Sequence, residues 1–282
     1  MMEYLCGYAN AKINLTLDVV GTRNDGYHLI KSVMQPISLA DEIKIRKTDD
    51  GKITIRSNDS TVPCDERNTV YKACVKYFDF TQVSKCGVEI YIDKHIPSEA
   101  GLGGGSADAA AVIKLLDEMF ETNLSLEDMC EIGAQVGADV PFCVISKTSL
   151  CEGMGEVITP LESLKKHYIL LIKPNFGVST PLAYKLFDEK GVTTANASGE
   201  MVDAISLGND ITKLLANDLE SAIENEEISM IKARLIENGA DGALMTGSGS
   251  CVYGLFNVKE TAFTAFEALS DSYPFVYLAQ TL

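Results

Sequence analysis

Four glycines within five residues, from Gly101 to Gly105, run directly into Ser106. Glycine lets a backbone approach a ligand closely and adopt strained conformations. The Ala-rich, apolar residues 109–120 that follow predict a helix, and the first N–H groups of a helix lack partners inside it and attract phosphate. The hydroxyl of Ser106 can meet a phosphate oxygen or a metal ion. This segment therefore predicts a phosphate-binding loop, with a flexible turn as the alternative.

Two other nucleotide-binding loops fit this segment less well. A Walker A loop requires Gly-Lys-Ser or Gly-Lys-Thr, and the sequence contains neither triplet. The dinucleotide-binding fingerprint G-x-G-x-x-G requires a glycine where Ser106 stands. The predicted loop therefore belongs to a different class of phosphate-binding segment.

Composition excludes several classes of function. The formal net charge of −16 argues against broad nucleic-acid or anionic-membrane surfaces, which need clustered Lys and Arg. No apolar run approaches the ~18 residues of a membrane span, and the start Met1-Met2-Glu3 lacks the basic residues of a secretory signal. The eight cysteines form no C-x-x-C pair, and the three histidines are far apart. We therefore expect a cytoplasmic protein with reduced thiols and neither nucleic-acid nor membrane partners.

The elements that must position the loop follow from apolar spacing. Alternation from Ile13 to Val19 predicts a half-buried strand, residues 23–26 a turn, and residues 27–38 a second strand. The remaining predicted elements are a hairpin over 43–55, a helix over 70–78 capped by Asn68, a strand over 88–92, a helix after a capping box at Ser125 and Asp128, a strand over 168–172, helices from Pro181, over 211–224 and over 227–238, and strands over 243–245 and 251–256. Strands first and helices later indicate an α+β fold.

Residues 97–106 resemble the phosphate loop of the GHMP kinases, P-x-x-x-G-L-G-[SG]-[SG]-S. The family is named for galactokinase, homoserine kinase, mevalonate kinase and phosphomevalonate kinase. The resemblance implies ATP as phosphoryl donor, a Mg²⁺ ion that Ser106 can contact, and two α+β lobes with the active site between them. The pattern restarts after about residue 155, so we expect an ATP-binding domain over 1–155 and a C-terminal GHMP domain over 156–282. The ATP-binding residues implied are Pro97, Ser98, Glu99, Ala100, Gly101, Leu102, Gly103, Gly104, Gly105, Ser106 and Ala107.

Further segments resemble one branch of this family, the 4-diphosphocytidyl-2-C-methyl-D-erythritol kinases of bacterial isoprenoid biosynthesis. These segments are Ala11–Leu15, Arg23–His28, Gly137–Pro141, Glu152–Glu156 and Thr246–Gly249. They occur in the expected order over nearly the whole chain. The resemblance implies that ATP phosphorylates the 2-hydroxyl of 4-diphosphocytidyl-2-C-methyl-D-erythritol, the small-molecule substrate, in the methylerythritol phosphate route.

Position in these segments implies that Lys12 and Asp139 are the catalytic pair. The transition state of phosphoryl transfer is loose, so positioning and charge stabilisation matter more than early proton removal. Asp139 can orient the hydroxyl and accept its proton late, and Lys12 can keep Asp139 ionised. Taken alone, Lys12 would be an ordinary strand-edge lysine and Asp139 a turn or cap residue before Pro141.

The same resemblance implies contacts with the acceptor. Asn14, Tyr27 and His28 are expected to line its pocket, with His28 forming hydrogen bonds to the cytosine edge. Thr180 and Tyr184 are expected to border the cytidine, where Tyr184 offers an aromatic face for stacking. A place in the protein core is the alternative for His28 and for Tyr184.

Other positions are less distinctive. Asn68 and Lys94 are implied to border the adenosine, with a surface role as the alternative for Lys94. Residues 247–250 are implied to form a wall of the active site, with a hairpin turn as the alternative. Glu99 departs from the family pattern, since a carboxylate beside a triphosphate is repulsive unless it points outward or meets magnesium.

Two other functions stay open at this point. The first is another GHMP kinase, such as homoserine kinase, which would share the phosphate loop. The second is a non-catalytic binding protein on the same fold, although the intact Lys12, Ser106 and Asp139 weigh against it. We expect a monomer or a weak homodimer.

Overall fold

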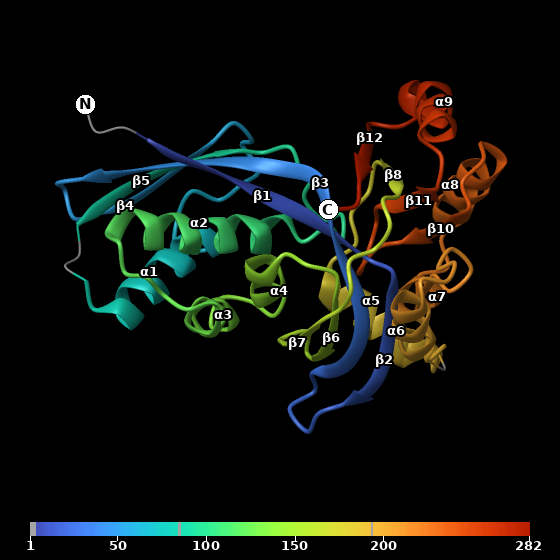
Figure 1. Ribbon diagram of the computed structural model, residues 1–282, viewed down its shortest axis with the longest axis horizontal. Helices are drawn as coiled ribbons and strands as arrows, with labels where there is room; N and C mark the ends of the chain where they lie inside the picture. Colours follow the sequence, from blue (N-terminus) through green and yellow to red (C-terminus); the bar gives the residue numbers. More distant parts are fainter. Residues whose placement is uncertain (1–3, 84–85, 193) are drawn as a thin grey trace. The chain divides into compact units, whose positions relative to one another are not determined.

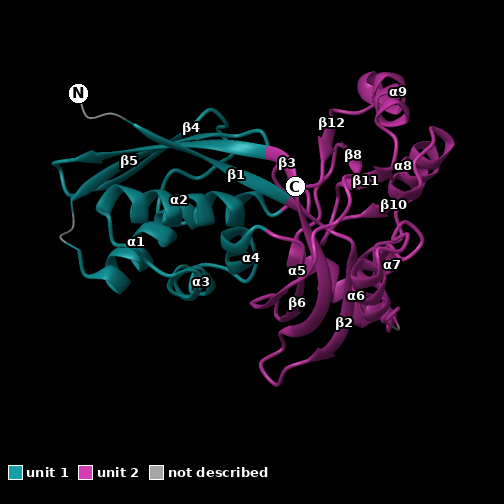
Figure 2. Cartoon of the chain, in the orientation of Figure 1, with its two compact units in different colours: residues 1–11, 40–96, 103–146 teal, residues 12–39, 97–102, 147–282 magenta. Residues whose placement is uncertain are grey.

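The computed structural model describes residues 4–83, 86–192 and 194–282. Chain contacts divide it into two compact units, each discontinuous in sequence (Figure 2). Unit 1 comprises Met1–Ala11, Ala40–Ile96 and Gly103–Ser146, and unit 2 comprises Lys12–Leu39, Pro97–Leu102 and Lys147–Leu282. The domain boundary expected after residue 155 stays a prediction. Within the described ranges, no helix is both long and apolar enough to cross a membrane.

Unit 1 is a layer of strands with helices packed on one face (Figure 1). Its strands are the first part of β1 (Leu5–Asn14), the second part of β3 (His28–Thr48), β4 (Ile53–Ser57) and β5 (Gly87–Asp93). Its helices are α1 (Thr69–Thr81), α2 (Gly104–Phe120), α3 (Leu126–Ala134) and α4 (Val140–Ile145). Apolar side chains of both layers form one core, which fixes α2 against the strands.

The helix caps predicted in unit 1 are confirmed, and the strand pairing predicted over residues 43–55 is wrong. Asn68 caps α1, and the capping box of Ser125 and Asp128 starts α3. The predicted hairpin over residues 43–55 does not form, because β5 lies between its two strands. β5 is antiparallel to β3 and parallel to β4. A turn signal specifies a chain reversal but not which strand becomes the neighbour.

Unit 2 contains the first part of β3 and a separate sheet. β3 pairs there with β2 (Thr16–Thr22) and with β6 (Ser149–Gly153), while β6 also pairs with β7 (Val157–Pro160) and β2 with β9 (Ala216–Asn217). The separate antiparallel sheet has the order β10 (Gly242–Met245), β11 (Val252–Phe256), β8 (Tyr168–Lys173), β12 (Phe275–Gln280). The helices are α5 (Thr180–Lys190), α6 (Ala197–Leu207), α7 (Asp218–Ala222), α8 (Glu226–Glu237), α9 (Lys259–Leu269) and the 3₁₀ turn η1 (Ser270–Ser272).

The prediction that one face of the strand over residues 13–19 is exposed to solvent is wrong. β1 ends at Asn14 and β2 begins at Thr16, and the polar residues Asn14, Thr16 and Asp18 are all 0% exposed. Each is hydrogen-bonded; Asp18, for example, accepts from two backbone N–H groups at the start of α6 at 2.8 and 2.9 Å. Buried polar groups are tolerated when they are bonded in this way. The segment is therefore buried on both faces.

The helix predicted over residues 211–224 is also shorter than expected. Only α7 forms there, and β9 occupies residues just before it. The α+β class itself is confirmed.

Candidate active site

The first half of the glycine-rich loop, residues 97–102, is held by backbone hydrogen bonds within unit 2. The N–H of Lys12 donates to the carbonyl of Leu102 at 3.0 Å. Two N–H groups of the β10–β11 connection, residues 246–251, donate to two further carbonyl groups of the loop at 3.3 Å each. The loop is therefore fixed to the end of β1 and to a second glycine-containing loop.

Glycine is required where these two loops meet. Gly101 has a φ of +71°, and a Cβ at this position would lie 2.0 Å from the carbonyl oxygen of Thr246. Gly247 has a φ of +56°, and its Cβ would lie 3.0 Å from the carbonyl oxygen of Gly101. The 247–250 segment is therefore a hairpin connection between β10 and β11 that also packs against the predicted phosphate loop.

The side chain of Glu99 lies beside Gly177. Glu99 has a φ of +50° and is exposed, and a Cβ at Gly177 would lie 2.3 Å from one of its carboxylate oxygens. The acidic residue that departs from the family pattern is thus directed at the segment between β8 and α5, and Gly177 leaves the space for it.

The second half of the loop begins α2 in unit 1. Gly103, with a φ of +71°, is the N-cap residue, and α2 starts at Gly104 rather than near residue 109. The first N–H groups of any helix have no partner inside it. The hydroxyl of Thr69, the first residue of α1, donates to the carbonyl of Gly105 at 2.7 Å. This bond ties the start of α1 to the start of α2.

Unit 1 also brings the Gly137–Pro141 segment to this helix start. A Cβ at Gly137 would lie 4.0 Å from the hydroxyl oxygen of Ser106, so the two segments are neighbours. Asp139 follows two residues later, half-buried, at the N-cap position of α4. Its carboxylate accepts no capping hydrogen bond from the described first turn of α4. Of the two alternatives for Asp139, capping by its side chain is therefore wrong, whereas its backbone does lie in a turn.

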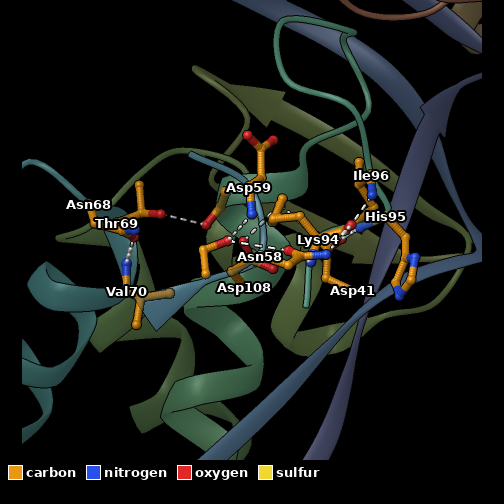
Figure 3. A network of polar contacts seen from close by, with 12 residues as sticks. Asp41, Asn58, Asp59, Asn68, Thr69, Val70, Lys94, His95, Ile96 and Asp108 are labelled. Carbon is orange, nitrogen blue, oxygen red and sulfur yellow. Dashed lines mark hydrogen bonds and ion pairs between the residues drawn. The ribbon is translucent and has the colours of Figure 1, made fainter. Parts of the chain in front are cut away.

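The ammonium group of Lys94 lies between two carboxylates (Figure 3). Its Nζ is 2.5 Å from Asp41 Oδ2 and 2.9 Å from Asp108 Oδ2, and at most 7% of any of the three side chains is exposed. The other oxygen of Asp41 accepts from the N–H groups of His95 and Ile96 at 2.5 and 2.8 Å. The surface role considered for Lys94 is therefore wrong, because its charge is buried and paired.

Burial and neighbouring charges shift the pKa of Asp108 and the pKa of Lys94. Burial raises the pKa of Asp108 to about 7, and Lys94 opposes that rise. Burial by itself would lower the pKa of Lys94, but attraction to Asp108 and Asp41 outweighs it and raises that pKa. Lys94 therefore stays charged and connects the end of β5 to the first turns of α2.

Asn68 and Lys12 are likewise engaged by neighbouring groups. Asn68 accepts from the N–H of Val70 at 2.8 Å and donates to the carbonyl of Pro63 at 2.6 Å. Lys12 is 4% exposed, and its Nζ donates to Asn14 Oδ1 at 2.7 Å. The strand-edge alternative for Lys12 is therefore wrong.

The predicted cytidine residues form two contacts in unit 2. The rings of His28 and Tyr184 stack with centroids 4.5 Å apart and planes at 14°, and His28 Nε2 lies 2.8 Å from Asp188 Oδ1. The hydroxyls of Thr180 and Ser248 lie 3.0 Å apart. Asp188 was not predicted, although it stands four residues after Tyr184 and so shares its helix face.

Comparison with known proteins identifies the family. Residues 68–147 match the GHMP kinases N terminal domain, and residues 201–274 match GHMP kinases C terminal. The 4-diphosphocytidyl-2-C-methyl-D-erythritol kinase of Clostridium tetani (strain Massachusetts / E88) is 42% identical over 97% of this chain and 99% of its own length. The chain belongs to the 4-diphosphocytidyl-2-C-methyl-D-erythritol kinase family of GHMP kinases. Members of this family are phosphotransferases, and a GHMP kinase is expected to use ATP.

Solved structures agree with this family assignment. A crystal structure of 4-(cytidine 5'-diphospho)-2C-methyl-D-erythritol kinase has a TM-score of 0.82 and 29% identity, covering 98% of this chain and 99% of that one. The homoserine kinase of Cytophaga hutchinsonii ATCC 33406 has a TM-score of 0.79 at 17% identity, covering 100% and 95%, which shows the fold alone. The predicted GHMP kinase fold is confirmed.

Within this kinase family fold, the Lys94 cluster predicts a stability effect. We expect Lys94→Met to lower the free energy of unfolding by about 3–5 kcal/mol, because it leaves two buried carboxylates without their cation. Urea denaturation followed by circular dichroism measures the loss. Arg56→Met is the control, since the Arg56 side chain is 68% exposed and 3.8 Å from Glu89, and its loss should be much smaller. Unchanged stability with weakened ATP binding would instead mean that the Lys94 charge serves the nucleotide.

Proposed function

We propose that this chain transfers the γ-phosphoryl group of ATP to the 2-hydroxyl of 4-diphosphocytidyl-2-C-methyl-D-erythritol, giving ADP and the 2-phosphate. The proposal places the chain in the methylerythritol phosphate route to isoprenoid precursors, acting in the cytoplasm as a monomer or weak homodimer. The observation that carries it is the 42% identity to the Clostridium tetani kinase of that name over nearly the full length of both chains.

The proposed roles on the donor side follow from the chemistry of phosphoryl transfer. The loop of residues 97–107 and the N–H groups at the start of α2 bind the triphosphate. Asp139 orients the acceptor hydroxyl and takes its proton late, while Lys12 stabilises negative charge during transfer. Asn68 and Lys94 are proposed to border the adenosine.

Magnesium is proposed to neutralise charge on the triphosphate. Among the described residues, no cluster of three His, Cys, Asp or Glu side chains could hold a metal by itself. That arrangement fits Mg²⁺, which keeps several waters and usually takes one or two protein ligands together with substrate phosphates. The half-buried hydroxyl of Ser106, beside the Gly137 segment, is the proposed protein contact.

On the acceptor side, Asn14, Tyr27, His28, Thr180 and Tyr184 are proposed to bind the cytidylyl substrate. Tyr27 supports this role because it is 64% exposed next to the buried ring of His28. A large exposed aromatic side chain offers a surface on which a base can lie.

A coupled assay of ADP release with a panel of acceptor alcohols tests the proposed reaction. We expect turnover with the cytidylyl substrate, and none with homoserine or mevalonate. Turnover with homoserine alone would assign the chain to a different GHMP kinase activity. Binding of ATP without turnover on any acceptor would favour a non-catalytic protein on this fold.

We predict that Asp139→Asn lowers kcat by about 10²–10⁴, the usual contribution of a positioned acid–base group, while ATP affinity is retained. Steady-state kinetics and calorimetry with ATP measure the two effects. Asp128→Asn is the matched control, because Asp128 also stands at a helix start in unit 1 but serves the capping box of α3. A variant of Asp139 that kept more than half of the wild-type kcat would remove this residue from the mechanism.

We also predict that Tyr184→Ala raises KM for the cytidylyl substrate roughly 5- to 150-fold. This corresponds to the ~1–3 kcal/mol that an aromatic contributes by stacking on a base. Tyr184→Phe retains the ring and should stay near wild type. KM for ATP should barely change, since the stack acts on the acceptor. If Tyr184→Ala instead raised only KM for ATP, the assignment of Tyr184 as the residue that stacks on the cytosine would be wrong.

A further inference from the structure

The amide group of Asn14 lies between Lys12 and Ser32. Its oxygen accepts from Lys12 Nζ at 2.7 Å, and its nitrogen donates to Ser32 Oγ at 2.8 Å. The hydroxyl of Ser32 donates in turn to the carbonyl of Thr16 at 2.6 Å. These residues belong to β1, β2 and β3 of unit 2, and Asn14 and Ser32 are both 0% exposed. A buried polar chain thus leads from a backbone carbonyl to the ammonium group.

The direction of this chain fixes which end of the amide faces Lys12. A carbonyl can only accept, so the single proton of Ser32 points to Thr16. The Ser32 oxygen can then only accept a hydrogen bond from Asn14, so the NH₂ group of the amide faces Ser32. The amide oxygen of Asn14 consequently faces Lys12. An amide rotated by half a turn would set its NH₂ group against the ammonium group, donor against donor. Ser32 therefore holds the NH₂ end of the amide and supports the orientation that Lys12 and the Thr246 hydroxyl require at the oxygen end.

The backbone of Asn14 has hydrogen bonds of its own, although the hydroxyl of Thr246 also lies 3.3 Å from the amide oxygen. Its N–H donates to the hydroxyl of Thr246 at 3.0 Å, and its carbonyl accepts from the buried hydroxyl of Tyr253 at 3.0 Å. These bonds hold the main chain in place whichever way the amide points. Loss of the Ser32 hydroxyl is therefore expected to disturb the amide orientation more than the strand.

We propose that Ser32 is a positioning residue for the transfer step, which it serves by orienting the Asn14 amide that holds the ammonium group of Lys12. The inference rests on the proposed role of Lys12 in the reaction. Because none of its surface is exposed, Ser32 does not touch a substrate itself, and it acts through the Asn14 amide. Misplacing a catalytic group by about 1 Å costs up to ~100-fold in rate.

We expect Ser32→Ala to lower kcat by about 10- to 100-fold, with KM for ATP within about twofold of wild type. The decisive experiment is the same substitution in a Lys12→Met background, followed by single-turnover kinetics with enzyme in excess. If Ser32 acts through Lys12, Ser32→Ala causes no further loss there. A merely structural residue would lower the rate by the same factor in both backgrounds.

Ser149→Ala is the matched control. Ser149 is also fully buried in unit 2, on β6 beside β3, and its hydroxyl donates to the carbonyl of Lys147 at 2.9 Å. It has no place in the chain of bonds to Lys12, so its removal should leave kcat near wild type. Should Ser32→Ala fail to fold, Ser32→Cys keeps the volume and replaces the hydroxyl by a weaker acceptor, and its kcat should fall in the same direction.

The possible outcomes distinguish failure of the role of Ser32 from failure of the proposed role of Lys12. If Lys12→Met abolishes turnover while Ser32→Ala stays within twofold of wild-type kcat, the inference about Ser32 is overturned and the proposed function stands. Equal loss in both backgrounds overturns it as well. If Lys12→Met retains turnover, the proposed role of Lys12 fails, and the role of Ser32 fails with it.

Discussion

A buried ammonium group is stable only where oxygen atoms stand in fixed positions around it, and the burial of Lys12 imposes that constraint on unit 2. Removing such a charge from water costs several kcal/mol unless protein dipoles replace the lost hydration. Asn14 supplies one such dipole, and Ser32 binds the other end of its amide. The buried polar residues Asn14 and Ser32 therefore serve Lys12, whereas Asp18 on β2 serves the start of α6.

Unit 1 holds its buried lysine in a different way. Lys94 meets two carboxylates, so its charge is balanced inside the protein. Asp108 stands in α2, and Asp41 also binds the backbone after β5. The cluster thus fastens the helix that begins at the phosphate loop to the strand layer beneath it. Lys12 thus donates to an amide oxygen within unit 2, whereas Lys94 pairs with two carboxylates within unit 1.

The sequence predicted what depends on neighbours along the chain. The Asn68 cap, the capping box at Ser125 and the turn over residues 23–26 each follow from a few adjacent residues, and all three form. The motifs of the family likewise lie in short segments. The amino-acid sequence alone was therefore enough to propose Lys12 and Asp139 as catalytic residues and to locate the glycines of the loop.

What the sequence could not supply depends on contacts between distant segments. The alternation of polar and apolar residues predicted that Asn14 faces solvent, but it is buried. Its backbone N–H donates to Thr246, which stands 232 residues away in the sequence. The hairpin over residues 43–55 failed for the same reason, since β5 enters from outside the local sequence. Ser32 carries no motif of its own, and only the bonds that it makes to Asn14 and Thr16 reveal its place.

In a phosphate-binding loop the carbonyl oxygens need hydrogen-bond donors within the protein, because a carbonyl oxygen that faces an anion repels it. The backbone N–H groups of the loop then remain for the phosphate. Four consecutive carbonyl groups, from Glu99 to Leu102, accept hydrogen bonds within unit 2. Their donors are the backbone of Lys12, the hydroxyl of Thr246 and two N–H groups of the β10–β11 connection. Since these oxygens are engaged, N–H groups are the polar groups left for the phosphate contact that we propose for this loop. Lys12 and Thr246 therefore contribute twice, once through the Asn14 network and once by removing acceptors from the loop.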